Sequence, residues 1–138
     1  MIDHVSIPVN DFARAAAFYD AVLATLGYRR LKEREGAIGF GFEPGFPPEF
    51  WILQRENDRA ASAGIGLHIS FRAESREQVH RFHQAALAHG GTDAGAPGSR
   101  PHYTAGFYGA FAFDPEGFKI EAVVREALPN RRQFGDGY

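Results

Sequence analysis

The chain carries a weak internal repeat, and this repeat limits the folds that are open to it. A shift of 64 residues places His4 on His68 within the 138-residue sequence. Identical residues then also coincide at Ser6 and Ser70, Phe18 and Phe82, Ala21 and Ala85, Leu23 and Leu87, and Gly27 and Gly91. Self-similarity of this kind is typical of folds that repeat one supersecondary unit. We therefore expect two copies of one unit.

The first copy has the pattern β-α-β-β-β. Val5, Ile7 and Val9 alternate with His4, Ser6 and Pro8, which predicts a strand. Apolar residues then recur at helical spacing, after a cap at Asn10 or Asp11 and up to a stop at Gly27. Three further strands are expected near 28–33, 37–42 and 49–54.

The second copy follows the same order. A strand at 67–71 precedes a capping box of Ser75 and Gln78, and the helix ends at Gly90-Gly91. A poorly marked strand lies somewhere in 92–100, and clear strands lie near 107–113 and 118–125. Asp114-Pro115-Glu116-Gly117 has the composition of a tight turn between the last two.

We expect a single α+β domain over 1–138. Module one covers about 1–55, a polar linker about 56–64, module two about 65–125, and an irregular tail 126–138. Hydrophobic residues make up 44% of the chain and charged residues 23%, which suits a globular protein with a real core.

Composition also excludes several classes. A net charge of −2 without a basic stripe argues against nucleic acid as a partner. The absence of cysteine excludes disulfides and thiolate metal sites. No apolar run approaches the length of a membrane span, and the N-terminus lacks a signal pattern. A cytoplasmic protein is the expectation.

Alternation places three chemically active side chains on one face. On the first strand of each copy the apolar residues face the helix, so His4 and His68 lie on the opposite face. With a four-residue loop at 114–117, Ala110 is expected opposite Glu121. Lys119 and Glu121 then share the histidines' face, together with Tyr108.

Two imidazoles and a carboxylate, with coordination positions left open, suit a divalent metal such as Fe, Mn, Ni or Zn. Each of the three residues has an ordinary structural interpretation when it is taken alone. Their occurrence at equivalent repeat positions is what favours a metal site on His4, His68 and Glu121.

The sequence resembles the vicinal-oxygen-chelate superfamily, also called the glyoxalase/bleomycin-resistance/dioxygenase superfamily. The resemblance rests on Ile2-Asp3-His4-Val5, on Ala17-Phe18-Tyr19, and on the stretch from Asp114 to Glu121, and it covers about residues 2–125. It implies two βαβββ modules that form an incomplete barrel around one metal. The family's ligand positions fall on His4, His68 and Glu121, and its habit of pairing modules between chains implies a homodimer.

One departure separates the chain from glyoxalase I within this family. Those enzymes add a fourth protein ligand from the last strand of the first module. Aligning that strand with the last strand of the chain places Leu53 at the position that matches Glu121, and leucine cannot bind a metal. The three-ligand pattern is closer to the extradiol dioxygenases and the fosfomycin-modifying thiol transferases.

We expect a metal-dependent enzyme acting on a small substrate with adjacent oxygens, and we favour a dioxygenase-like reaction. An acid or base for ring cleavage would come from Tyr108, Tyr103 or His102, the last two in a loop at 97–106 that could act as a lid.

Two alternatives remain open. A fosfomycin-type transferase would use Arg100 and Lys119 for a phosphonate. A protein that binds without turnover would stack a planar ligand on Trp51, and its metal residues would then be relics.

Overall fold

The computed structural model describes residues 2–55 and 67–126. The first module contains β1 (Val5–Val9), α1 (Phe12–Ala24), β2 (Arg29–Arg34), β3 (Ala37–Gly41) and β4 (Phe50–Gln54). The second contains β5 (His68–Arg72), α2 (Arg76–Ala88), β6 (Thr92–Ser99), β7 (Phe107–Phe113) and β8 (Lys119–Arg125). The predicted linker, and the tail from residue 127 onward, lie outside the described residues.

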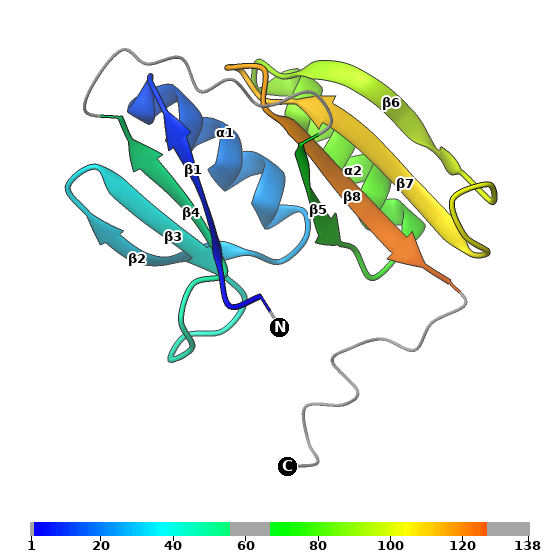
Figure 1. Cartoon of the computed structure of the whole chain (residues 1–138), viewed down its shortest axis with the longest axis horizontal. Helices are drawn as coiled ribbons and strands as arrows, with labels where there is room; N and C mark the ends of the chain where they lie inside the picture. Colours follow the sequence, from blue (N-terminus) through cyan, green and yellow to red (C-terminus); the bar gives the residue numbers. More distant parts are fainter. Residues whose placement is uncertain (1, 56–66, 127–138) are drawn as a thin grey trace.

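Each module forms its own four-stranded sheet (Figure 1). The strand orders are β1-β4-β3-β2 and β5-β8-β7-β6, so the two sheets have the same topology. The first strand of each module pairs in parallel with the last, and the other pairs are antiparallel. This confirms the α+β fold of two βαβββ modules. The described strands form no closed barrel, because the two sheets remain separate.

Both helices begin where the sequence predicts, and they end three and two residues before the predicted glycine stops, at Ala24 and Ala88. The Asp11 side chain accepts a hydrogen bond from the Arg14 amide at 3.1 Å, and the Ser75 hydroxyl accepts one from the Gln78 amide at 3.2 Å. In return, the Gln78 side chain accepts from the amide of Glu74, one residue before the cap. These bonds join residues no more than four positions apart, so they fix the start of both helices locally.

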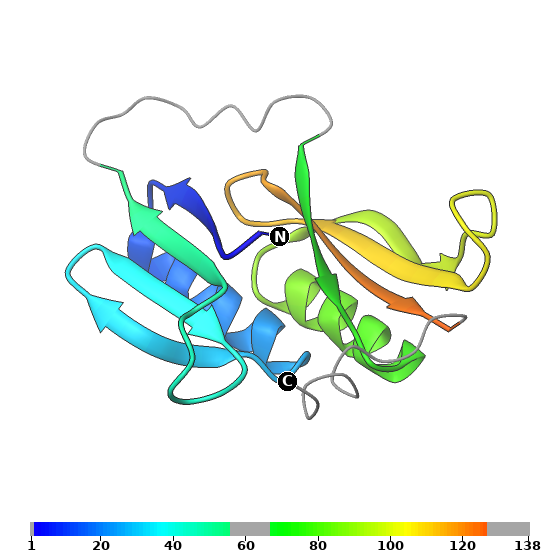
Figure 2. The ribbon, with the colours of Figure 1, turned by 60° about the horizontal axis from the view of Figure 1, so that its bottom comes forward.

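The two helices lie side by side, and each covers one face of its own sheet (Figure 2). One cluster of buried side chains extends from the first module into the second. Phe71 of β5 shows the contact between modules, since its ring lies 5.3 Å from that of Phe50 and 5.9 Å from that of Tyr28. The modules therefore share a core on the helical side of their sheets.

The turn between β7 and β8 joins the second module to the start of α1. The Glu116 carboxylate accepts hydrogen bonds from the amides of Asn10 and Asp11, at 2.8 and 3.0 Å. The buried Tyr19 hydroxyl donates to Asp114 at 2.7 Å. Two side chains of one turn thus bind the opposite module, which ties the position of the turn to that of α1.

The same turn corrects the predicted register of the last hairpin. Phe113 pairs with Lys119, and Phe111 pairs with Glu121, where Ala110 was expected. The cause is Asp114, whose carboxylate accepts from the Phe118 amide at 2.9 Å and so removes that residue from the ladder. The loop therefore covers 114–118, one residue more than predicted.

The register change moves Tyr108 to the other face, so the prediction that it shares a face with Glu121 is wrong. Tyr108 packs against the helix-side core, and its hydroxyl lies 2.7 Å from Nε2 of His80 on α2. The Arg76 guanidinium lies over its ring at 4.4 Å.

No helix within the described residues is long and apolar enough to cross a membrane.

The bond between Tyr19 and Asp114 makes a testable contribution to stability. Burial raises the pKa of Asp114, while hydrogen bonds from Tyr19 and from backbone amides oppose that rise. We expect Tyr19→Phe to lower the free energy of unfolding by about 1–3 kcal/mol at neutral pH. Urea titrations of both proteins at several pH values measure this loss.

The pH dependence has a defined sign. An acid whose pKa is raised on folding costs stability as pH rises through that pKa, because the folded state binds more protons. Loss of the Tyr19 hydroxyl enlarges this cost, so the penalty should shrink as pH falls through the pKa of Asp114. Tyr28→Phe is the control, since it removes an exposed hydrogen bond to Glu49. A penalty no larger than that of the control would contradict the assignment.

Candidate metal and substrate site

The helix-free face of the second sheet is apolar at its centre and charged around it. Phe107, Phe111 and Val123 form a small buried cluster there, separate from the helix-side core. Glu121 lies directly opposite Phe111 in the ladder and shares this face. The hairpin thus buries a carboxylate on the face that carries no helix.

Glu121 meets His68 on this face. The Oε2 atom of Glu121 lies 3.0 Å from Nε2 of His68, and the two side chains are 5% and 36% exposed. The imidazole stands edge-on to Phe111, with ring centroids 5.9 Å apart. A buried carboxylate oxygen and a half-exposed imidazole nitrogen therefore point at the same place, as two adjacent ligands of one metal would.

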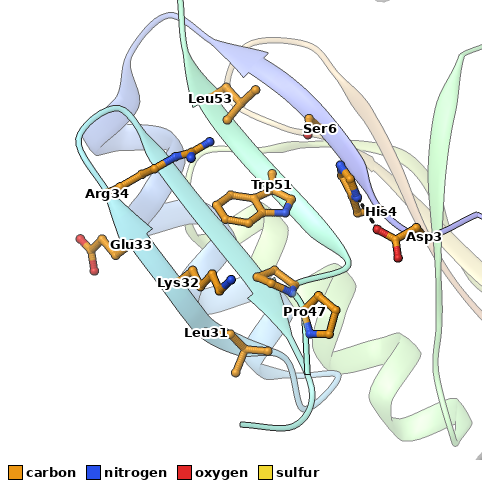
Figure 3. A pocket seen from close by; sticks show the side chains of 11 residues that line it. Asp3, His4, Ser6, Leu31, Lys32, Glu33, Arg34, Pro47, Trp51 and Leu53 are labelled. Carbon is orange, nitrogen blue, oxygen red and sulfur yellow. Dashed lines mark hydrogen bonds and ion pairs between the residues drawn. The ribbon is translucent and has the colours of Figure 1, made fainter. Parts of the chain in front are cut away.

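His4 lies in the other module. Its Nδ1 atom is 2.6 Å from Asp3, and the ring lines a pocket of about 680 Å³ on the helix-free face of the first sheet (Figure 3). Trp51 of β4 and Ser6 line the same pocket. Within 2–55 and 67–126, no three histidine or carboxylate side chains gather closely enough to hold a metal. One chain thus brings together two of the three predicted ligands.

The two histidines are separated because each lies at the start of the edge strand of a different sheet. His4 directly precedes β1, His68 begins β5, and both strands form an edge of their sheet. The packing of α1 against α2 uses the other faces of the sheets. Each half of the predicted site is therefore presented from a different module.

The ladder also corrects which residue of the first module matches Glu121. Ser70 pairs with Glu121, and its repeat equivalent Ser6 pairs with Trp51. The matching residue is therefore Trp51, two positions before the predicted Leu53. An indole cannot bind a divalent metal, so the first module still offers no fourth ligand.

The predicted cations have different surroundings. Arg100 donates hydrogen bonds to the carbonyl oxygens of Ala96, Gly98 and Gly109, and so braces β6 against β7. Lys119 remains on the face of Glu121, with its ammonium 4.7 Å from the centre of the Phe111 ring. Lys119 is thus available to an anionic ligand, whereas Arg100 is committed to the backbone.

The loop that was predicted as a lid is a hydrogen-bonded turn. The Tyr103 amide donates to the Arg100 carbonyl at 3.0 Å, and Arg125 donates to the Thr104 hydroxyl at 2.6 Å. The His102 ring meets Tyr103 edge-on, and the centre of the Tyr103 ring lies 5.1 Å from that of Phe107. Both aromatic side chains therefore stand at the end of the face that carries Glu121.

Sequence reasoning missed three residues of these two faces. Phe111 pairs with Glu121 where Ala110 was expected, and so lies on the face of the site. Lys32 and Arg34 line the pocket beside Trp51. Their alternation on β2 was visible in the sequence, but a bulge between Arg30 and Lys32 sets which residues face the pocket.

The fold and the site define a class, namely paired βαβββ modules with a histidine at the first strand of each module and a glutamate on the last strand. The chain belongs to the Glyoxalase/Bleomycin resistance protein/Dioxygenase superfamily, whose family model matches residues 1–122. No curated protein sequence matches the chain. The match to the family model confirms the resemblance found in the sequence.

Solved structures of similar proteins agree with the family. A glyoxalase/bleomycin resistance protein from Albidiferax ferrireducens T118 is 35% identical, with a TM-score of 0.77 over 88% of this chain and 96% of that one. A family enzyme from Burkholderia phytofirmans PsJN is 21% identical, with a TM-score of 0.67 over 88% and 96%. A glyoxalase I mutant from Zea mays is 19% identical, with a TM-score of 0.68 over 87% of this chain and 45% of that one. The last two support the fold alone.

The position of the Trp51 indole requires that residue 39 has no side chain. A Cβ atom at residue 39 would lie 2.6 Å from Pro48 and 2.9 Å from the Trp51 indole. We expect Gly39→Ala to displace the indole and to lower the free energy of unfolding by about 1–3 kcal/mol. Urea unfolding followed by the fluorescence of Trp51, the one tryptophan of the chain, measures both effects.

Gly98→Ala is the matched control. Its added Cβ would meet nothing closer than the Ala96 carbonyl oxygen at 3.9 Å, so its effect should stay within about 0.5 kcal/mol. Equal stability and equal emission spectra of the two variants would show that Trp51 does not depend on the space at Gly39.

Proposed function

We propose that this protein is a metal-dependent enzyme in which His68 and Glu121 of one chain and His4 of a second chain hold one divalent metal. The observation that carries the proposal is the approach of His68 Nε2 to Glu121 Oε2, 3.0 Å apart on a face without a helix. The substrate is a small molecule chelated through adjacent oxygens.

The chemistry of these donors fits a divalent ion. Burial of the Glu121 carboxylate is costly unless an imidazole proton or a metal neutralises it. Two imidazole nitrogens and one carboxylate oxygen suit Fe, Mn, Ni or Zn and leave coordination positions open. When bound, such a metal supplies Lewis-acid polarisation of the substrate oxygens.

The arrangement of the modules favours a homodimer. The helix-side faces of both sheets are buried within the chain. By contrast, β1 and β5 each have one edge that pairs with no other strand among the described residues. A second copy that sets its β1 edge along β5 would cover both edges and bring its His4 toward His68. The repeat relates the two histidines, so a two-fold axis would generate two equal sites.

The protein's own residues then have separate tasks. Glu121 supplies the negative charge of the ligand set, and Phe111 and Val123 keep water from its inner side. Lys119 offers a positive charge to a substrate anion on the same face. Tyr103 and His102 remain the candidates for proton transfer, since Tyr108 faces α2.

A dioxygenase-like reaction is the version that we favour, because Trp51 stands where glyoxalase I would place a fourth ligand. The fosfomycin-type alternative loses support, since the guanidinium of Arg100 is bound to three carbonyl oxygens. Binding without turnover keeps one supporting observation, the pocket around Trp51.

Metal content tests the proposal. Protein purified without a histidine tag should contain about one divalent metal per chain after incubation with the preferred ion. His4→Ala, His68→Ala and Glu121→Ala should each lower that content at least tenfold, with circular dichroism spectra unchanged. Elemental analysis after gel filtration gives the measurement.

His89→Ala is the matched control, because His89 lies at the exposed end of α2 and bonds to the Ala85 carbonyl. It should retain the full metal content. Full occupancy in all three ligand variants would refute the site. No metal uptake by the unchanged protein from any of the four ions would favour binding without turnover.

A further inference from the structure

The pocket of the first sheet has a flat aromatic floor. β4 lies between β1 and β3, so Trp51 stands in the middle of the sheet. Its indole lies across Gly39, its ladder partner, and Pro48 packs on the same glycine. The absent side chain at Gly39 is what lets the indole lie close to the sheet. A ligand on this face therefore meets a fixed planar surface.

Two cations stand beside that surface on β2. Lys32 and Arg34 are two residues apart and line the pocket with Trp51. Their charged ends point over the sheet toward the indole, whereas the Glu33 carboxylate points away (Figure 3). The Arg34 guanidinium carbon lies 5.5 Å from the centre of the Trp51 ring. A ligand that lies against the indole therefore also meets the guanidinium that lies over the ring.

The nearby carboxylates make no ion pair with these cations. Glu33 lies 3.0 Å from Arg30, which also binds Asp20, and Asp3 lies 2.6 Å from Nδ1 of His4. Among the residues that the structure describes, neither Lys32 nor Arg34 takes part in an ion pair or a hydrogen bond with another side chain. One end of the pocket therefore carries two cations, next to an aromatic plane, that have no carboxylate partner among the described residues.

We propose that this pocket binds a planar aromatic molecule bearing an anionic group, with the ring on Trp51 and the anion between Lys32 and Arg34. A volume of about 680 Å³ is in the range of small-molecule sites. Stacking on the indole selects a flat ring, and the two cations select a carboxylate or a similar anion.

The register connects this pocket to the metal site. Trp51 occupies the position of the first module that matches Glu121 in the second. In the dimer proposed above, the indole of one chain would thus face the metal ligands of the other. The two copies of the repeat would have diverged, one toward holding a metal and the other toward holding a ring. That this ligand is the enzyme's substrate rests on the proposed function, whereas its binding does not.

Fluorescence of Trp51 tests the proposal directly, because the chain has no second tryptophan. Full-length protein in the presence of a chelator is titrated with benzoate, with its neutral isostere benzamide, and with cyclohexanecarboxylate, which has the charge without the flat ring. Benzoate should change the emission saturably. Benzamide and cyclohexanecarboxylate should each bind roughly tenfold more weakly.

Charge-removing variants locate the site. Arg34→Gln and Lys32→Gln should each weaken benzoate binding roughly tenfold, and Arg34→Lys should recover part of the loss. Arg81→Gln removes an exposed arginine on α2, outside the pocket, and should have no effect. Trp51→Phe, followed by calorimetry, should weaken binding without unfolding the protein.

The outcomes separate this proposal from the metal proposal. Glu121→Ala should lose metal and keep benzoate affinity within about twofold. Metal binding with no saturable response to benzoate would overturn the pocket and leave the metal site standing. Equal affinity for benzoate and benzamide, or an unchanged affinity in both charge variants, would also overturn it. Equal affinity for cyclohexanecarboxylate would overturn the stacking on Trp51.

Discussion

The packing of α1 against α2 decides which surfaces of this protein are open to chemistry. Each helix covers one face of its sheet, and the two covered faces merge into one core that includes Phe50, Tyr19 and Phe71. Asp114 and Glu116 secure that arrangement from the turn between β7 and β8. Since the helices cover one face of each sheet, the two described sheets can offer ligands only from their opposite faces.

Those opposite faces are alike in backbone and different in chemistry. On the second sheet, Glu121 and His68 meet beside Phe111. On the first sheet, the equivalent of Glu121 is Trp51, with cations on the neighbouring strand. We propose that the face of the second sheet binds the metal and that the face of the first sheet binds the ring. A two-fold dimer would combine both functions in each of two sites.

Local patterns made much of this predictable from the sequence. The repeat at His4 and His68 indicated two βαβββ modules, and alternation indicated which residues of β1 and β5 face the helices. Caps at Asp11 and Ser75 depend on neighbours only three residues away, so they also followed from the sequence.

The errors arose where a side-chain hydrogen bond or the pairing of distant strands overrides the pattern of alternation. The carboxylate of Asp114 takes the Phe118 amide out of the ladder, and this shift moved Tyr108 to the helix side. The Arg100 guanidinium donates hydrogen bonds to backbone carbonyl oxygens, and no sequence pattern predicts such bonds. The pairing of β4 with β1 placed Trp51, rather than Leu53, opposite Ser6. Each of these outcomes depends on a partner distant in sequence or on a side chain replacing a backbone bond.

The central claim is that two chains build each metal site, and a mixed dimer tests it most directly. Chains carrying His4→Ala and chains carrying Glu121→Ala are expressed together, so that random pairing makes about half the dimers mixed. Each mixed dimer should hold one intact site, which restores about one quarter of the normal metal content. A mixture of His68→Ala and Glu121→Ala should restore none, because both changes affect the same half-site. No recovery in the first mixture would show that His4 does not join His68 and Glu121 across chains.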